Sequence, residues 1–171
     1  MEYVLEKIIE AIDAAKPNLP SKEILSTIAF KWNNNELTTW DGGFDLNEKK
    51  REKIVHLLAP NFIKKDSNYL EILRFLLSQE IENCCEGEFC TTTLRNCYDY
   101  LANYKNLEDV LLLLSANDDT SFDANSALFK DRLFYNGYTN VIKYIKSQKN
   151  IDKEIIERFE YYGNYFGYNA E

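Results

Sequence analysis

The chain contains few of the residues that interrupt helices, with only three prolines and six glycines among 171 residues. A β fold with many turns needs more of both, so this shortage favours helices. No apolar run approaches the roughly 20 residues of a transmembrane helix. Residues 1–7 carry charges at helical spacing and no signal-peptide core. We therefore expect a cytoplasmic protein with no membrane partner.

Histidine is almost absent, since His56 is the only one. With no second histidine, a histidine-based metal site or catalytic pair is hard to assemble, and we expect His56 at the surface or the core edge. No serine lies in a G-x-S-x-G motif, and no glycine-rich loop could cradle a phosphate. We expect no enzymatic activity and no cofactor, although an unrecognised helical enzyme or metal-binding protein stays an open alternative.

The four cysteines, Cys84, Cys85, Cys90 and Cys97, lack the C-x₂-C pair that is typical of zinc sites. Adjacent Cys84 and Cys85 cannot easily reach one tetrahedral metal ion together. We expect reduced thiols, with Cys97 on a buried helix face and Cys90 near a loop. A disulfide such as Cys85–Cys90 would need an oxidising compartment.

Part of the spacing of a calcium-binding loop is present. With Asp41 at position 1, Asp45 falls at position 5 and Glu52 at position 12. Leu46 then takes the place of the required glycine, and Gly43 offers no side-chain oxygen at position 3. We therefore expect no bound metal ion.

Apolar residues make up 45% of the chain and aromatic residues 14%, enough for one folded domain with a substantial core. The formal net charge is −8, concentrated in residues 1–48 (−5) and 91–125 (−4). An acidic surface repels a phosphate backbone, so we expect no nucleic-acid binding. It attracts a basic protein by long-range steering. The alternative, that the charge merely keeps the protein soluble, stays open.

One segment recurs along the chain. Residues 70–78 (LEILRFLLS) reappear as 107–115 (LEDVLLLLS), and a looser copy lies at 139–147 (TNVIKYIKS). The copies are 37 and then 32 residues apart. Such spacings are typical of stacked helical hairpins, each too small to bury its own apolar face. Arrays of this kind usually work as binding surfaces.

Helical spacing of apolar residues predicts an all-α protein without long strand-like alternation. The predicted helices are 2–16, 21–32, 47–60, 68–83, 92–103, 106–115, 124–135, 138–147 and 152–162. Ser21 is the expected N-cap of the second helix, and Asp45 or Asn47 that of the third. Pro17 and Pro60 should end the first and third helices. We expect one domain over 1–171, with 1–48 as an N-terminal helical pair or cap and 49–171 as helical-hairpin repeats.

Residues 125–129 (NSALF), 136–145 (NGYTNVIKYI) and 150–152 (NID) resemble a diverged ankyrin repeat. In that family a threonine-proline-leucine-histidine stretch opens the first helix, and a glycine-histidine turn precedes a second helix rich in Val and Leu. Residues 92–94, 107–115 and 117–119 form a weaker second copy.

The match departs from the ankyrin pattern at several points. Phe129 stands where histidine is expected, Gly137 lacks its following histidine, and the first helix is at least two residues too long. The resemblance covers about residues 91–152 and implies a helical-hairpin solenoid. A compact orthogonal helical bundle is the alternative, and both architectures stay open.

In such a solenoid the loops 36–47, 82–91 and 116–123 project as a row from one edge. Each loop combines acids with an aromatic residue, a composition that suits contact with a basic protein. The candidate partner-binding residues are Trp40, Asp41, Asp45, Glu86, Glu88, Phe89, Asp118, Asp119, Phe122 and Asp123. Helix capping explains Asp45 and Asp123 equally well without a partner.

The leading hypothesis is an acidic inhibitor or immunity protein that neutralises a basic toxin or nuclease. The alternative is an adaptor or scaffold that binds on its concave helical face. That alternative predicts that the first-helix residues Arg95, Tyr98, Lys130 and Arg132 matter more than the loops.

Overall fold

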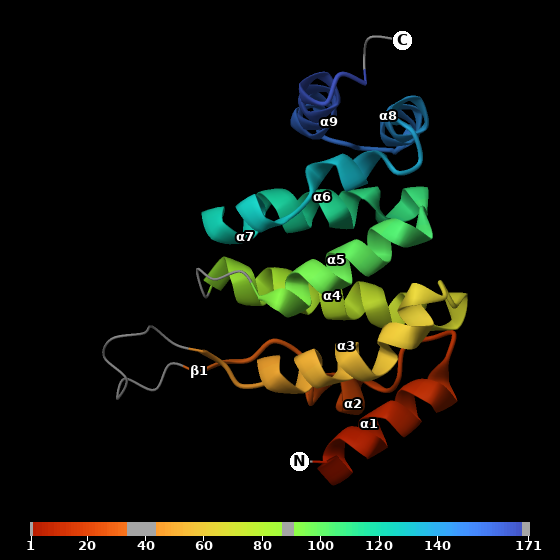
Figure 1. Cartoon of the computed structure of the whole chain (residues 1–171), viewed down its shortest axis with the longest axis vertical. Helices are drawn as coiled ribbons and strands as arrows, with labels where there is room; N and C mark the ends of the chain where they lie inside the picture. The colour runs from red at the N-terminus through yellow and green to blue at the C-terminus, as the bar shows by residue number, and fades with distance from the viewer. Residues whose placement is uncertain (1, 34–43, 87–90, 169–171) are drawn as a thin grey trace.

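The chain folds into a stack of helices, with its first and last helices at opposite ends of the stack (Figure 1). This computed structural model describes residues 2–33, 44–86 and 91–168. The α-helices are α1 (Glu2–Ala15), α2 (Lys22–Ser26), α3 (Glu48–Ile63), α4 (Leu70–Glu86), α5 (Thr92–Tyr104), α6 (Val110–Asp118), α7 (Phe122–Ala127), α8 (Tyr138–Ser147) and α9 (Lys153–Tyr165). The 3₁₀-helices are η1 (Ser67–Tyr69), η2 (Leu107–Asp109) and η3 (Lys130–Phe134). The predicted all-α class is confirmed.

Extended structure in the described residues is limited to one short antiparallel pair. β1 (Trp32–Asn33) pairs with β2 (Phe44–Asp45), and Trp32 lies opposite Asp45. The prediction that the second helix reaches residue 32 is therefore wrong. α2 begins after Ser21, as expected, but ends at Ser26, because the N–H and the hydroxyl of Thr27 both donate to the Ile24 carbonyl. These two bonds close the last turn.

The prediction that Pro60 ends the third helix is also wrong, because α3 continues to Ile63. Proline removes one backbone donor from a helix, and Pro60 lies on an exposed side where water can replace that bond. The Phe62 side chain is 0% exposed, and its ring centroid lies 5.6 Å from that of Tyr100. Burial of this ring stabilises the helical turn beyond the proline.

The predicted helix over 124–135 is interrupted. α7 ends at Ala127, Leu128 and Phe129 are extended, and η3 follows. The extended step carries Leu128 into the core, where it is 5% exposed, while Phe129 stays 56% exposed. α9, in contrast, runs on to Tyr165, beyond the predicted end of the last helix.

The three copies of the recurrent segment are all helical, in α4, in η2 with α6, and in α8. The main contacts join elements that are close in sequence: α3 with α4 and α5, α4 with α5 and α6, and α8 with α9. One cluster of buried apolar residues extends from Leu5 in α1 to Phe159 in α9. None of the described helices is long and apolar enough to cross a membrane.

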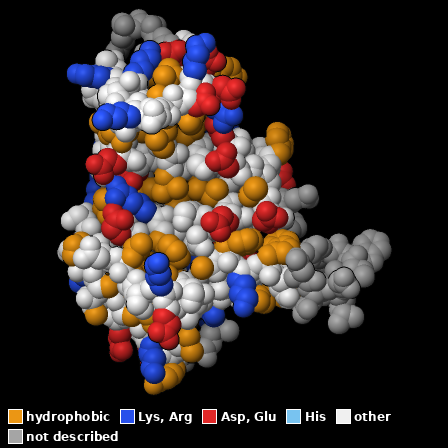
Figure 2. Space-filling model, turned by 180° about the vertical axis from the view of Figure 1, so that it is seen from behind, with side chains coloured by type: hydrophobic (Ala, Val, Ile, Leu, Met, Phe, Trp, Pro, Cys, Tyr) orange, Lys and Arg blue, Asp and Glu red, His pale blue; other side chains and the backbone are white. Residues whose placement is uncertain are grey.

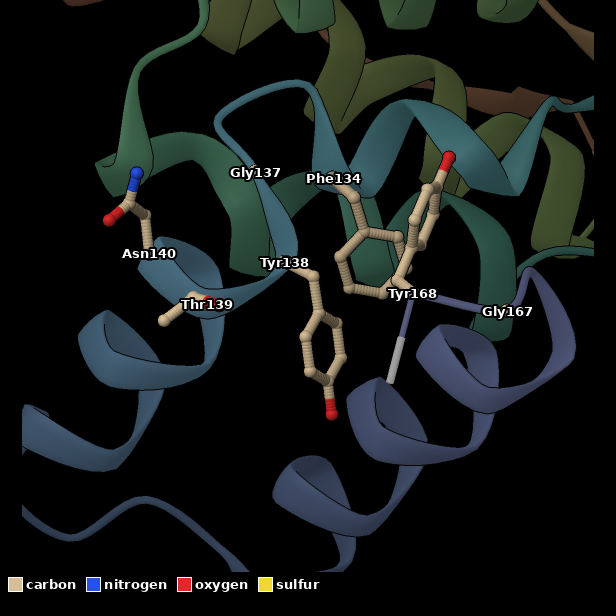
Figure 3. Close-up of a pocket in the computed structure, with 7 residues that line it drawn as sticks. All are labelled: Phe134, Gly137, Tyr138, Thr139, Asn140, Gly167 and Tyr168. Atoms are coloured by element: carbon tan, nitrogen blue, oxygen red, sulfur yellow. The ribbon is translucent and has the colours of Figure 1, made fainter. Parts of the chain in front are cut away.

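The last two helices meet around the ring of Tyr138, which Figure 3 shows beside Phe134 and Tyr168. A Cβ at Gly163 would lie 2.1 Å from Tyr138 Cε2, so only glycine lets this ring pack against α9. The Phe134 ring lies 5.5 Å from the Tyr138 ring, centroid to centroid. Phe134, Tyr138 and Tyr168 help to line a cavity of about 530 Å³, together with Gly137.

Candidate functional site

Three junctions that carry candidate residues lie on the same side of the helix stack. They are the β1–β2 pair, the end of α4 with the start of α5, and the α6–α7 junction (Figure 1). A backbone bond joins two of them, because the Ser121 N–H donates to the Cys84 carbonyl at 3.2 Å. The α6–α7 junction is therefore fixed directly to the last turn of α4.

Exposed acids and two exposed aromatic rings lie on this side. We call it the acidic edge, and its described members are Phe44, Glu82, Glu86, Asp119, Phe122 and Asp123, all of them exposed. Phe122 is 85% exposed and Phe44 51%. On the rear face, Figure 2 shows acidic side chains directly beside hydrophobic ones toward this flank. Among the described residues, none of the four carboxylates forms an ion pair.

The exposure of Phe122 follows from how α7 begins. Ser121 is the N-cap, and its hydroxyl accepts a hydrogen bond from the Ala124 N–H at 3.4 Å. Ala124 is 0% exposed and anchors the inner side of this short helix. Phe122, two residues earlier, is left in solvent. Asp123 lies in the first turn, where a carboxylate is favourable.

Of the predicted site residues, Glu86, Asp119, Phe122 and Asp123 are thus exposed on one side of the molecule. Trp40, Asp41, Glu88 and Phe89 lie outside the described residues, so their place in the site stays a prediction.

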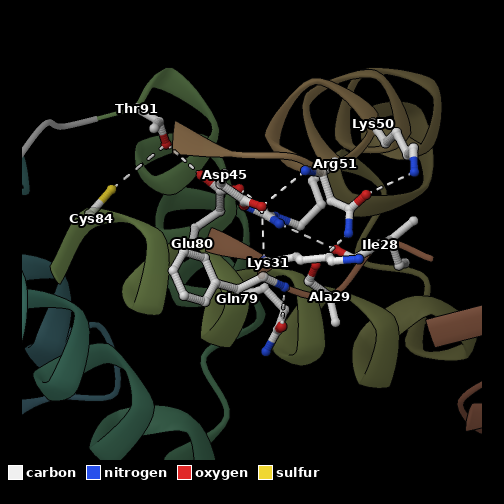
Figure 4. Close-up of polar contacts among 12 residues, drawn as sticks. Ile28, Ala29, Lys31, Asp45, Lys50, Arg51, Gln79, Glu80, Cys84 and Thr91 are labelled. Carbon is white, nitrogen blue, oxygen red and sulfur yellow. Dashed lines mark hydrogen bonds and ion pairs between the residues drawn. The ribbon is translucent and has the colours of Figure 1, made fainter. Parts of the chain in front are cut away.

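Asp45 is not available to a partner, contrary to the sequence analysis. It is 5% exposed, and its Oδ2 lies 2.5 Å from Nη2 of Arg51. Its Oδ1 accepts hydrogen bonds from the backbone N–H groups of Lys31 (3.0 Å) and Asn47 (2.9 Å). This carboxylate therefore holds the β2 strand to α3 (Figure 4).

Arg51 is the centre of this buried cluster and is itself 0% exposed. Its Nε donates to Glu80 Oε1 at 2.6 Å, and its Nη1 donates to the Ile28 carbonyl at 3.2 Å. The Thr91 hydroxyl, at the N-cap of α5, donates to Glu80 Oε2 at 2.6 Å. Figure 4 shows these contacts joining the segment before β1 to α3, α4 and α5.

The cluster contains two carboxyl groups and one guanidinium, and the pKa values of Glu80 and Arg51 reflect both burial and their mutual attraction. Burial raises the pKa of the Glu80 carboxyl, and the opposing effect of Arg51 does not fully offset it. Burial alone would lower the pKa of Arg51, but Glu80 and Asp45 raise it by more, so the guanidinium stays charged. The cluster is a structural fixture beneath the acidic edge.

Asp118 is also engaged within the chain, and its contact with a partner stays a prediction. Its side chain is 10% exposed, and its Oδ2 accepts a bond from Arg158 Nη1 at 2.9 Å. The Tyr162 hydroxyl donates to Oδ1 at 2.8 Å. Asp118 thus joins α6 to α9, whereas the next residue, Asp119, is exposed, and its carboxylate accepts a hydrogen bond only from the nearby Ser115 hydroxyl among the described residues.

The residues of the alternative concave face are also largely engaged. Tyr98 is 0% exposed, and its hydroxyl donates to the Phe129 carbonyl at 3.0 Å. Arg132 forms an ion pair with Asp99 at 2.7 Å. Arg95 is exposed.

A groove lined by aromatic residues was not predicted from the sequence. It lies between η3 and α9 and has a volume of about 500 Å³. Its lining residues are Leu128, Phe129, Lys130, Asp131, Tyr161, Tyr162, Tyr165 and Phe166. The sequence does contain a pattern that could have indicated this groove. Aromatic residues are paired four positions apart, Tyr161 with Tyr165 and Tyr162 with Phe166. Continuing the last helix beyond residue 162 would have placed each pair on one face.

Metal-ligating and nucleophilic residues do not gather in the part of the chain that the structure describes. No group of three or more His, Cys, Asp or Glu there could hold a metal ion. His56 is exposed on α3, as expected of a lone histidine. Cys97 is 0% exposed, as expected, and burial raises the pKa of its thiol, which keeps it protonated and unreactive.

Comparison of the chain with models of known protein families, with curated proteins and with solved structures gave no match.

Proposed function

We propose that this chain is a protein-binding module that uses the acidic edge to hold a basic protein. In its most concrete form it is an inhibitor or immunity protein that covers the basic active site of a toxin or nuclease. The observation that carries the proposal is Phe122, which is 85% exposed and is flanked in sequence by Asp119 and Asp123, two exposed acids with no ion pair among the described residues.

The two kinds of residue would have different tasks. An exposed aromatic ring is a typical interface anchor, because it buries much apolar surface at little cost in side-chain entropy. Carboxylates around it raise the association rate of a basic protein and disfavour acidic ones. Ion pairs at the rim of an interface contribute little to affinity. Phe122 should therefore set the dissociation rate, whereas the acids should set the association rate.

The scaffold supports this role because it holds the edge in position before binding. The Ser121–Cys84 backbone bond fixes the α6–α7 junction to α4, and the Arg51 cluster fixes β2 to α3, α4 and α5. A preorganised surface loses less conformational entropy on binding. We also propose that the helical pairs form a solenoid, since the main contacts join elements close in sequence.

The test is a pull-down from lysate of the source cells at low and high salt, with mass spectrometry of the retained proteins. Three baits are compared: the unchanged chain, Phe122→Ala, and Asp119→Asn with Asp123→Asn. The matched control is Glu6→Asn with Glu10→Asn, because both acids are exposed on α1 and carry the same charge.

We expect one basic protein, released by salt from the unchanged chain, lost with Phe122→Ala and weakened by the edge pair but not by the control pair. A partner that stays bound at high salt and binds equally to all edge variants would favour the adaptor. No partner under either condition would refute both forms of protein binding.

A further inference from the structure

The aromatic groove between η3 and α9 adjoins the acidic edge. Lys130 Nζ, in the groove lining, donates to the Asn125 carbonyl of α7 at 3.4 Å. On the other wall, Tyr162 donates to Asp118, the last residue of α6, at 2.8 Å. A protein that covers the α6–α7 junction would therefore reach the groove as well.

The rings that line the groove are unusually exposed for aromatic side chains. Tyr161 and Tyr165, one turn apart on α9, are 64% and 74% exposed. Phe129, from the residue before η3, is 56% exposed. The face of an aromatic ring carries partial negative charge and attracts cations. Three such rings around one groove therefore favour a positively charged occupant.

The chain already places two of its own cations against the rings of this groove. Lys130 Nζ lies 5.8 Å from the Tyr162 centroid, and Arg132 Cζ lies 5.2 Å from the Phe129 centroid. Lys130 is held by Asn125 and Arg132 by Asp99. Each of these cations thus has its own polar partner.

Asp131 differs from its neighbours in the lining. Its carboxylate has neither an ion pair nor a hydrogen bond among the described residues, although two cationic residues flank it in the sequence. The groove therefore combines exposed ring faces with a carboxylate that forms no ion pair among the described residues.

We propose that this groove binds the guanidinium group of an arginine side chain on the basic protein partner. A guanidinium is planar and weakly hydrated, so it can stack on a tyrosine ring while its fork of N–H groups donates to a carboxylate. The groove supplies the rings through Tyr161 and Tyr165 and the carboxylate through Asp131. The inference deepens the proposed function and rests on it, because it names what the partner presents next to the acidic edge.

The test uses a short, end-blocked, fluorescent peptide with one arginine among neutral residues, and a matched peptide with citrulline in its place. Citrulline keeps the shape of arginine but carries no charge. Binding to the full chain is measured by fluorescence anisotropy. We expect the arginine peptide to bind about tenfold more tightly than the citrulline peptide. Equal binding of the two peptides, or no binding of the arginine peptide, overturns the proposal.

Variants locate the binding. Asp131→Asn should weaken binding of the arginine peptide by about fivefold or more and leave binding of the citrulline peptide unchanged. Tyr165→Leu keeps apolar area but removes the ring, and it should weaken binding of the arginine peptide by about two- to fivefold. Asp131→Glu, which restores the charge, should recover most of the loss. Thermal unfolding verifies that each variant is folded.

The control variant is Glu6→Gln, which removes one exposed charge on α1, outside both the acidic edge and the groove lining. It should leave peptide binding unchanged. An equal loss with Glu6→Gln and Asp131→Asn would mean general electrostatic attraction and would overturn the arginine site. Failure here is distinct from failure of the proposed function, because the pull-down depends on Phe122 and the edge acids and not on Asp131.

Discussion

Arg51 of α3 and Glu80 of α4 form an ion pair of 2.6 Å in which neither side chain is exposed to solvent. A buried ion pair loses much of its attraction to desolvation, so its net contribution to stability is small. Breaking it is a different matter, because the remaining charge stays buried. Here the loss of Arg51 would leave two carboxylates, those of Glu80 and Asp45, without their cation.

Arg51→Met should therefore lower the free energy of unfolding by about 3–5 kcal/mol. The measurement is urea unfolding followed by circular dichroism. Lys49→Met is the control on the same helix, because the Lys49–Glu52 pair is 80% and 55% exposed. It should change stability by less than about 0.5 kcal/mol. Similar losses for both variants would contradict a buried role for Arg51.

Glu80→Gln should reveal the pH dependence of the cluster. The folded-state pKa of Glu80 is raised above the ordinary 4.5, so the folded chain binds this proton more tightly than the unfolded chain. Its contribution to stability is full below the ordinary pKa and is lost as the pH rises through the raised pKa. The stability of the unchanged chain relative to Glu80→Gln should hence improve as the pH falls. Urea unfolding at several pH values measures this, and a constant difference would refute it.

Asp118 and Asp119 should separate in their effects although they are adjacent. Asp118→Asn weakens the bonds from Arg158 and Tyr162, and we expect a loss of about 1–2 kcal/mol in unfolding free energy. Asp119→Asn should leave stability within about 0.5 kcal/mol. With the partner in hand, Asp119→Asn should slow association at low salt, measured by stopped-flow fluorescence. A loss of stability with Asp119→Asn, or slower association with Asp118→Asn alone, would contradict the acidic edge as described.

Gly163→Ala should destabilise the protein although alanine is the better helix former. Propensity alone favours alanine by about 1 kcal/mol, but the new Cβ would lie 2.1 Å from Tyr138 Cε2. Because the Tyr138 ring must move, the variant should lose about 1–3 kcal/mol of unfolding free energy in total. Thermal unfolding measures it, and in Tyr138→Leu the same glycine substitution should cost much less. Additive effects of the two changes would show that the ring and Gly163 do not interact.

The long helices could be predicted because their apolar residues keep one period over several turns. The segments 70–83, 92–103 and 138–147 are helical as expected. The second helix was predicted too long because Ile28 and Trp32 continue its spacing. Only tertiary contacts show that the chain leaves the helix at Thr27.

The candidate site could be predicted only in part, for a similar reason. In sequence, Asp45 and Asp118 look like Asp119 and Asp123, since all four are acids near helix ends. What distinguishes Asp118 is Arg158, which is 40 residues away. A partner at that distance cannot be identified from spacing. Asp45 has its partner Arg51 nearby in α3, but the groups that bury this pair, Glu80 of α4 and the Ile28 carbonyl, are distant in sequence.

The contacts between neighbouring layers also bear on how the chain folds. Because the main contacts join elements close in sequence, loops closed during folding are short. Chains with such low contact order fold quickly, and segments at one end can open while the other end keeps its structure. The α8–α9 pair carries one wall of the aromatic groove, whereas the Arg51 cluster lies toward the opposite end of the stack (Figure 1). Hydrogen exchange at α9 should therefore report local opening and not global unfolding.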